Sequence, residues 1–437
     1  MDEFTYRDGA LWCERVSLAA VARQYGTPTY VYSASTLTDH YRRFAKAFHA
    51  VNPLVCFSAK ALGNVHLLRL LGTEGAGIDA VSGGELHRAQ VAGIDPDRIV
   101  LAGVGKSEDE LRVAVRLDIR CVNVESEAEV DRLAHVAREE GRRPRLAIRV
   151  NPNVAPDQRT PAKTTTGTRG GKFGVDIERA AALFRSASAN EALRAEGFHL
   201  HLGSPIYDPQ VYAVALDRLL TLVAECEADG LRVTTINVGG GFPAEYADRT
   251  APAWDDFAEV IVPRLTDFAS RGDQVIFEPG RTIAANAGIL ISTVRYLKQA
   301  GDRELAIVDA GMTHLVRTAM YDSYHFMWPV QPPANAVPTS RDVHDAAGLV
   351  EYDVVGPICE SSDYLARGRA LPPLESGSQL AIFSAGAYGM TMTSNYNGQP
   401  RPAEVLVDGD QTTLIRRRET YEDLVALELS DDADRLG

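Results

Sequence analysis

Cysteine is scarce in this 437-residue chain, and its five cysteines lie far apart without a CxxC pair. Such spacing indicates neither a disulfide framework nor a cysteine zinc site. We therefore expect reduced thiols, a cytoplasmic location and no bound metal. The cysteines are Cys13, Cys56, Cys121, Cys226 and Cys359.

Long hydrophobic runs and an excess of basic charge are also absent. No stretch reaches the ~18 apolar residues of a membrane span, and the acidic first segment, MDEFTYRDGA, is unlike a secretory signal. Acidic residues outnumber basic ones by 59 to 45, a net charge of −14. The chain thus offers no electrostatic footprint for nucleic acid or anionic lipid. These absences predict a small-molecule partner, with no nucleic acid and no membrane.

A repeated strand-and-helix pattern occupies the region between about residues 50 and 283. Short apolar, β-branched runs alternate with amphipathic stretches whose apolar residues are three and four apart, which is a βα rhythm. Eight such runs occur, the number that closes a (β/α)8 barrel, although periodicity alone also fits a doubly wound open sheet. The runs are VCFSAK, GIDAVS, RIVLAG, CVNVES, LAIRVN, GFHLHLG, TINVGGG and VIFEPGR.

From about residue 284 the pattern changes to short strands with turns, from ILISTVRYL to TTLIRRR, which predicts a separate β-domain. Two domains suit the length, because single cores stop growing near ~250–300 residues. We predict an α/β fold with a (β/α)8 TIM-type barrel over 34–283. A second domain, a β-sandwich or β-barrel, is expected over 1–33 and 284–437. The strand-like TPTYVYSAS could join that domain or lead into the barrel.

One connection in the barrel region is unusually long. Residues 152–174 are rich in Thr, Gly and Pro and have no clear periodicity, whereas loops in compact domains are mostly short. We expect the segment to be either a mobile lid over a site or an irregular insertion on the far side of the barrel.

Unusual polar residues fall at one end of the predicted strands. Barrel enzymes build their sites at the carboxyl ends of their strands, so several polar residues on that face indicate a site. They are Lys60, Ser82, Glu125, Asn151, His201, Gly239 to Gly241, Glu278 and Arg281.

Lys60 and Glu278 have the most specific chemistry of this group. The chain has only six lysines, and one at the end of an apolar strand suits Schiff-base formation, because desolvation lowers the pKa of its amine. Alternatively, the ammonium group of Lys60 simply extends into solvent. Glu278 could hold a pyridine nitrogen protonated, ligate a metal or pair with Arg281. Glycines 239–241 could cradle a phosphate or form a tight turn.

Two histidines, His199 and His201, alternate on one predicted strand and so point to the same side of the sheet. Either imidazole could stack on a cofactor ring. Together with Glu278 they could also ligate a metal, which leaves a metal-dependent barrel hydrolase as an alternative function.

Between about residues 26 and 425 the chain contains, in order, TPTYVY, FSAKAL, GIDAVSGGEL, AGVGKS, NVES, RVNP, GGKFG, HLGS, NVGGGFP, EPGR, VDAGM, GPICESSD, AGAYG and YNGQPRPAEVLV. These motifs resemble the barrel-type family of pyridoxal-phosphate decarboxylases, which includes enzymes acting on diaminopimelate, ornithine and arginine. So many matches in one order make the resemblance highly specific.

The resemblance implies pyridoxal 5'-phosphate as cofactor and assigns roles by position. Lys60 would bind the cofactor as a Schiff base, and His201, also catalytic, would stack on its ring. Glu278 would pair with the pyridine nitrogen, and Asp79 would lie near the cofactor. The phosphate would be bound by Ser204, Gly239, Gly240, Gly241, Gly280, Arg281 and Tyr388. This assignment gives a role to Lys60 as well as to Glu278 and His201, whereas a metal hydrolase would not need the lysine.

The resemblance also implies a substrate and an assembly. It favours the decarboxylation of meso-2,6-diaminopimelate to L-lysine and CO2, the last step of lysine biosynthesis. A decarboxylase of a related amino acid, such as ornithine or arginine, is the alternative. Cys359, a proton donor, would come from the neighbouring subunit of a homodimer with shared sites, to which the β-domain contributes. The substrate would be bound by Arg281, Arg317, Tyr321, Glu360 and Tyr388.

Four positions depart from the family pattern, and all concern substrate recognition. They are Leu62, where asparagine is usual, Pro205 for glutamine, Thr318 for proline and Ser362 for glycine. Related racemases of this fold place an arginine where this chain has Glu278, which disfavours a racemase. A catalytically silent relative is disfavoured because Lys60 and the phosphate contacts are retained.

Overall fold

The computed structural model describes residues 2–154, 160, 166, 170–247, 251–338, 340–341 and 348–429. The predicted lid, 152–174, therefore falls mostly outside the described residues. The chain divides into two compact units, which we call the β unit and the barrel unit. The β unit comprises residues 1–37, 245–250 and 284–437, and the barrel unit comprises 38–244 and 251–283.

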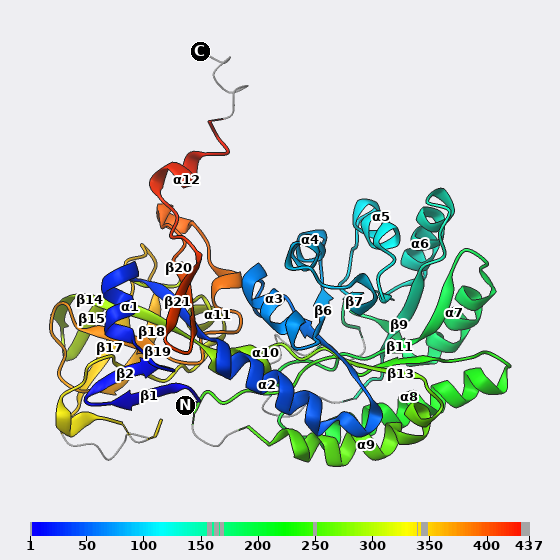
Figure 1. Ribbon diagram of the computed structural model, residues 1–437, viewed down its shortest axis with the longest axis horizontal. Helices are drawn as coiled ribbons and strands as arrows, with labels where there is room; N and C mark the ends of the chain where they lie inside the picture. The colour runs from blue at the N-terminus through cyan, green and yellow to red at the C-terminus, as the bar shows by residue number, and fades with distance from the viewer. Residues whose placement is uncertain are drawn as a thin grey trace. The chain divides into compact units, whose positions relative to one another are not determined.

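Eight parallel strands form a closed ring in the barrel unit (Figure 1). The ring closes because β13 pairs with β5, with Ile276 opposite Leu54 and Phe277 opposite Val55. This pairing confirms the predicted barrel and excludes the open sheet. In ring order the strands are β5 (Leu54–Ser58), β6 (Gly77–Ala80), β7 (Ile99–Leu101), β8 (Cys121–Val124), β9 (Arg145–Asn151), β11 (Arg194–His199), β12 (Thr235–Asn237) and β13 (Gln274–Phe277), with the short β10 (Val175–Asp176) beside β9.

Helices alternate with the barrel strands and begin at residues suited to capping. Ser82, Ser107 and Ser126 accept backbone N–H groups three residues ahead and cap α4, α5 and α6. The helices are α2 (Ala34–Ala47), α3 (Val65–Thr73), α4 (Gly83–Ala92), α5 (Glu108–Leu117), α6 (Glu127–Glu139), α7 (Ile177–Ala189), α8 (Gln210–Ala228), α9 (Trp254–Ser270) and the single turn α10 (Arg281–Ala284).

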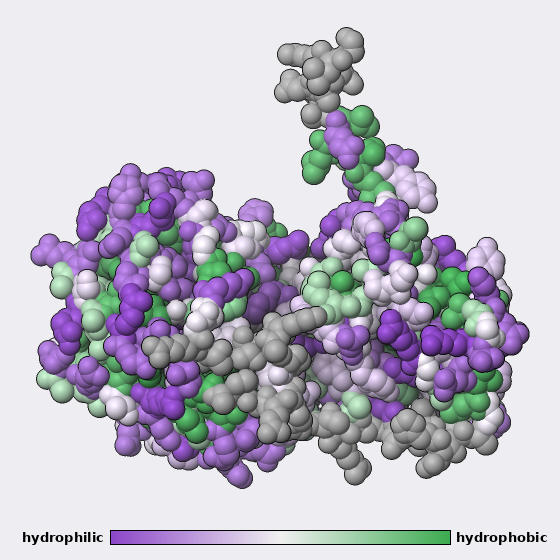
Figure 2. All heavy atoms as spheres, turned by 180° about the vertical axis from the view of Figure 1, so that it is seen from behind, coloured by the Kyte–Doolittle hydropathy of each residue, from purple (hydrophilic) through white to green (hydrophobic). Residues whose placement is uncertain are grey.

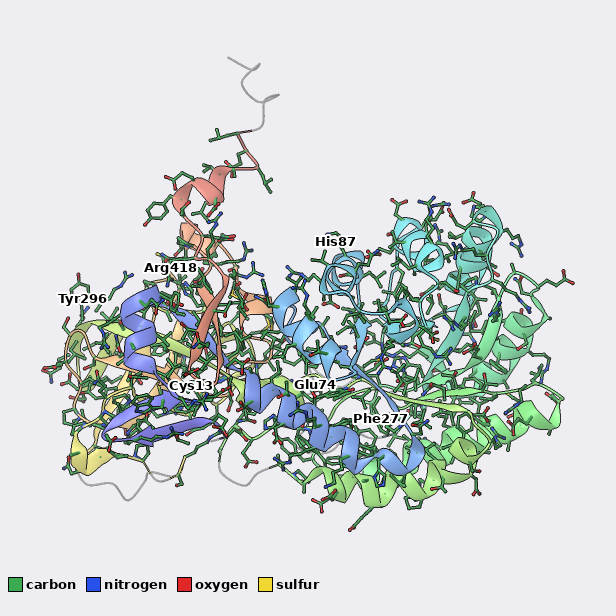
Figure 3. The ribbon with its side chains drawn as sticks, viewed as in Figure 1. Cys13, Glu74, His87, Phe277, Tyr296 and Arg418 are labelled. Carbon is green, nitrogen blue, oxygen red and sulfur yellow. The ribbon has the colours of Figure 1, made fainter. Side chains whose placement is uncertain are left out.

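Apolar side chains from several strands fill the barrel unit. One fully or nearly fully buried cluster consists of Leu54, Cys56, Val100, Cys121, Ala147 and Ile276. A second cluster is aromatic: Phe277, labelled in Figure 3, packs 4.5 Å from Phe48, and Phe44 packs 4.9 Å from Phe242, measured between ring centroids. These clusters bury the strands from which the polar residues of the site project.

The β unit contains a nine-stranded sheet in the order β18-β17-β15-β14-β4-β20-β21, and β19 pairs with both β14 and β16. Strand β4 (Thr29–Ser33), from TPTYVYSAS, pairs with β14 and β20, so that segment joins this unit. The other strands are β14 (Gly288–Ala300), β15 (Arg303–Val308), β16 (Met327–Pro329), β17 (Val350–Val355), β18 (Tyr364–Leu371), β19 (Gln379–Ile382), β20 (Ala403–Asp408) and β21 (Gln411–Arg416), beside a small sheet of β1 (Phe4–Arg7), β2 (Ala10–Cys13) and β3 (Val16–Ser17).

Hydrophilic residues cover most of the face shown in Figure 2.

The short helices of the β unit are α1 (Leu18–Tyr25), α11 (Arg317–Tyr321) and α12 (Tyr421–Val425). Exposed apolar residues follow α12, where Leu427 is 96% exposed. Across the part of the chain that the structure describes, no helix is both long enough and apolar enough for a bilayer crossing.

Gly197 in β11 is a sensitive point of barrel packing, because a Cβ there would lie 1.8 Å from the backbone oxygen of Thr235 in β12. We expect Gly197→Ala to lower the melting temperature by several degrees, since overpacking a core costs ~1–3 kcal/mol. Gly84→Ala in α4 is the matched control, because its Cβ would meet only Ser82 Oγ at 3.8 Å. Equal melting temperatures of the two variants, measured by calorimetry, would contradict this packing.

Candidate active site

Lys60 and Asp79 meet at the carboxyl ends of two neighbouring barrel strands. Lys60 lies two residues beyond β5, and Asp79 is in β6. The buried Asp79 accepts a hydrogen bond from Ser58 Oγ, and its Oδ2 lies 3.3 Å from Lys60 Nζ. Within the described part of the chain, Asp79 Oδ1 is buried without a hydrogen-bond partner. Since buried polar groups are nearly always paired, this oxygen is available to a ligand.

The pKa of the Asp79 carboxyl is raised above its ordinary value. Burial and the nearby charge of Glu278 raise it, and they outweigh Lys60 and the hydrogen bond from Ser58, which lower it. Asp79 therefore holds a proton more readily than an exposed aspartate does. The Lys60 side chain is 31% exposed, so its amine is accessible from outside the protein core.

Glu278, directly after β13, is a buried carboxylate that faces three donors. Its Oε1 accepts from Asn237 Nδ2 at 2.6 Å and from Asn123 Nδ2 at 3.2 Å, and its Oε2 lies 3.1 Å from His199 Nε2. Burial alone would raise the pKa of Glu278, but the charge and hydrogen bond of His199 and the charge of Lys60 lower it below the ordinary value. Glu278 is therefore held ionised inside the protein.

His201 lies two residues beyond the end of β11. Its Nδ1 accepts the N–H of Gly240 at 3.3 Å. Burial and the positive charges of Lys60 and Arg149 lower the pKa of His201 well below 6.5. The imidazole is thus neutral at pH 7, a state in which it can stack on an aromatic ring without repelling a nearby cation.

The glycine segment after β12 permits close approach of two backbones. Gly239 has a φ of +75°, and a Cβ there would lie 2.0 Å from a backbone oxygen. Gly239 N–H donates to Asn237 Oδ1 at 2.9 Å, and Gly240 N–H donates to His201. Of the three glycine N–H groups, that of Gly241 alone lacks an acceptor among the residues described.

Arg281 and Ser204 provide further anion-binding groups near this segment. Arg281 Nε donates to Ser204 Oγ at 3.1 Å, and a Cβ on Gly241 would lie 2.5 Å from the oxygen of Gly203, the neighbour of Ser204. Gly280, beside Arg281, approaches Ser58 so closely that a Cβ would meet its Cβ at 2.8 Å. A guanidinium, a hydroxyl and a backbone N–H are groups that bind phosphate.

In the β unit, Arg317 is held by two hydroxyl groups. This buried residue begins α11, donates from Nη1 to Tyr246 Oη at 2.6 Å and from Nη2 to Ser323 Oγ at 3.2 Å, and lies 4.9 Å from the Tyr246 ring centroid. Tyr321 ends the same helix. Hydroxyl partners leave the positive charge of Arg317 without a neutralising carboxylate among these contacts, so its guanidinium is suited to an anionic ligand.

The remaining predicted site residues of the β unit lie in loops. Cys359 and Glu360 are exposed, and Glu360 Oε1 accepts from Tyr396 Oη at 2.5 Å. Cys359 N–H donates to Asn397 Oδ1 at 2.7 Å. Tyr388 is half-buried with a φ of +55°. These contacts place Cys359 and Glu360 at the surface of this chain.

Three residues at these sites, Asn123, Asn237 and Tyr246, were missed by the sequence analysis. Both asparagines interrupt apolar runs, CVNVES and TINVGGG, and are fully buried. A polar residue inside a buried strand needs a partner, which is the signal that could have identified them. Tyr246 had no such signal, because its role depends on Arg317, 71 residues away in the sequence.

Among the described residues, His199, His201 and Glu278 are not found as a group whose ligand atoms lie close enough together to hold an ion. Among described residues, one group has ligand atoms close enough to hold an ion, and it lies on the outer helices α5 and α6. Its members are Glu108, His135 and Glu139. Both carboxylates pair with Arg112, at 2.9 and 2.8 Å, which satisfies them without an ion.

The barrel residues fit pyridoxal phosphate, as the unpaired Asp79 Oδ1 and the anion-binding groups around Gly241 indicate. The family model described as "Pyridoxal-dependent decarboxylase, pyridoxal binding domain" matches residues 34–285. The barrel is therefore that of a pyridoxal-dependent decarboxylase, and its cofactor is pyridoxal phosphate.

Comparison with individual proteins narrows the family. A diaminopimelate decarboxylase of Vibrio cholerae is 43% identical over 98% of this chain and 99% of its own length. A crystal structure of the M. jannaschii diaminopimelate decarboxylase in co-complex with L-lysine is 32% identical, with a TM-score of 0.90 over 99% of this chain and 98% of that one. A Vibrio vulnificus lysine/ornithine decarboxylase, 21% identical with a TM-score of 0.75 over 90% and 97% of the two chains, shares the fold. This chain belongs to the diaminopimelate decarboxylase family.

Proposed function

We propose that this chain releases CO2 from meso-2,6-diaminopimelate and forms L-lysine, the last step of lysine biosynthesis. The observation that carries the proposal is the ionised, buried Glu278 on the strand beside that of Lys60, since β13 pairs with β5. A carboxylate of this kind can keep a pyridine nitrogen protonated while the lysine amine binds the aldehyde. The relatives named for diaminopimelate support the choice of substrate.

Different residues of the chain would bind different parts of the cofactor. Bound pyridoxal phosphate supplies a ring that takes up the electron pair left by the departing carboxylate. Lys60 Nζ would hold the cofactor covalently. Glu278 would pair with the ring nitrogen and keep it protonated, and the neutral imidazole of His201 would pack on the ring. Asp79 would lie near the same group.

Other residues of the barrel unit would bind the phosphate group of the cofactor. Arg281 would supply charge, Ser204 a hydroxyl and Gly241 an N–H that has no acceptor among the described residues. Gly239, Gly240 and Gly280 act mainly through their small size, because side chains there would collide with neighbouring atoms. We also assign Tyr388 to the binding of the phosphate.

The β unit supplies substrate recognition. Arg317, pre-oriented by Tyr246 and Ser323, binds the distal carboxylate together with Tyr321. Arg281 and Tyr388 also contact the substrate.

The distal ammonium is bound by Glu360, and Cys359 Sγ delivers a proton to the carbon that has lost CO2. Both residues are exposed in this chain, which supports a homodimer in which they serve the partner's site. All five cysteines are free, which supports a cytoplasmic location.

A substrate panel tests the reaction. Protein loaded with pyridoxal phosphate is incubated separately with meso-diaminopimelate, L-ornithine, L-arginine and L-lysine, and CO2 is measured. We expect release from diaminopimelate alone, its loss in Lys60→Ala, which lacks the Schiff-base amine, and its retention in the exposed control Lys46→Ala. Release from ornithine or arginine instead would favour the related-decarboxylase alternative, and bound cofactor without CO2 from any substrate would refute the proposal.

Arg317→Met tests recognition of the distal carboxylate. Because a hydrogen bond to a charged group contributes ~1.5–3 kcal/mol, we expect kcat/KM for diaminopimelate to fall roughly 10- to 150-fold, while cofactor absorbance stays unchanged. The control is Arg367→Met, an exposed arginine of β18. An equal loss of kcat/KM in both variants would show that Arg317 does not bind the distal carboxylate of the substrate.

Mixing two inactive variants tests the shared sites. Lys60→Ala and Cys359→Ala are each expected to have little activity. In mixed homodimers with shared sites, one of the two sites has both residues intact, so equal mixing restores about a quarter of wild-type activity. The activity is measured after subunit exchange, and the absence of any recovery in verified mixed dimers would show that Cys359 serves its own chain.

A further inference from the structure

His199 is a buried histidine whose only hydrogen bond among the described residues goes to Glu278. Its side chain is 1% exposed, its Nε2 lies 3.1 Å from Glu278 Oε2, and its Nδ1 is buried without a partner. An unpaired buried nitrogen costs stability, and an apolar side chain would avoid that cost. The retention of an imidazole here therefore points to the bond that it makes with Glu278.

The proton on this bond can be assigned to His199 Nε2. If the imidazole proton were on Nδ1 instead, the lone pairs of Nε2 and of an ionised Oε2 would face each other at 3.1 Å, and two acceptors repel. An Nε2–H donates to Oε2, so the hydrogen bond requires a proton on this nitrogen. The geometry thus requires a donor at this position of the barrel.

Donors from the protein occupy most of the hydrogen-bond acceptor positions of the Glu278 carboxylate. A carboxylate has about four lone-pair positions. Asn123 and Asn237 occupy both positions on Oε1, and His199 occupies one on Oε2. One position remains, on Oε2, and its direction is set by the His199 bond.

We propose that His199 is a positioning residue for the cofactor: by donating to Oε2 it aims the last lone pair of Glu278 at the pyridine nitrogen and keeps the shared proton on that nitrogen. This inference rests on the proposed placement of the ring against Glu278. Without the donor, the proton leaves the ring nitrogen and forms an O–H on Oε2, so no other reactant is needed. The lowered pKa of Glu278, to which His199 contributes after the opposing effect of burial, agrees with this direction.

The test is the ¹⁵N NMR shift of ring-labelled pyridoxal phosphate bound to the holoenzyme, which distinguishes a protonated from a neutral nitrogen without measuring activity. We expect a protonated nitrogen in the wild type and in His199→Gln, whose amide retains a donor. His199→Leu should show a shift towards the neutral nitrogen, and kcat should fall about ten- to a hundred-fold with little change in KM, because the electron sink acts in the transition state.

Matched variants separate this inference from the proposed function. His40→Gln alters another buried histidine of the barrel unit and should leave the NMR shift unchanged. If His199→Leu does not fold, His199→Asn, whose amide is too short to reach Oε2, replaces it. A protonated nitrogen in these His199 variants, with a neutral one in Glu278→Gln, overturns the role of His199 alone. If the ¹⁵N shift in Glu278→Gln equals that of the wild type, the ring nitrogen does not lie against Glu278. That result overturns the proposed placement of the ring and, with it, the role of His199.

Discussion

Glu278 places a negative charge inside the barrel, and such burial is tolerated only when the charge is fully hydrogen-bonded. The donors come from three other strands: Asn123 from β8, His199 from β11 and Asn237 from β12. They converge because the ring of strands is closed. Asn237 also accepts the N–H of Gly239. One side chain therefore holds both the Glu278 carboxylate and the glycine segment.

The pKa values of the two carboxyl groups near Lys60 are shifted in opposite directions for physical reasons. Asp79 Oδ2 accepts from the Ser58 hydroxyl and from Lys60 Nζ, while Oδ1 has no partner among the described residues, and burial is the largest of the effects that raise its pKa. At Glu278 the charge and hydrogen bond of His199 and the charge of Lys60 overcome the same effect of burial and lower its pKa. Environments that separate the pKa values of neighbouring groups are typical of active sites. The pKa values of the two carboxyl groups are thus shifted in opposite directions within the same site.

Much of the fold was predictable because the βα rhythm and the carboxyl-end placement of polar residues follow from strand and helix periods. Strand β18 is one that the sequence pattern does not predict: its sequence is YLARGRAL, and it lies at the edge of the sheet, where charged residues are tolerated. Its arginines and glycine hide the strand pattern. Asn123 and Asn237 were missed because their importance lies in a partner distant in sequence, which local patterns do not reveal.

The sequence by itself determined the eight strands, the chemical types of the site residues and the resemblance to pyridoxal-phosphate decarboxylases, because these depend on local order and composition. Only the tertiary structure decided that β13 closes on β5, that the pKa of Asp79 is raised while that of Glu278 is lowered, and that Tyr246 holds Arg317. Each of these depends on contacts between segments far apart in the chain, where burial and hydrogen bonding set the protonation state and orientation of a side chain.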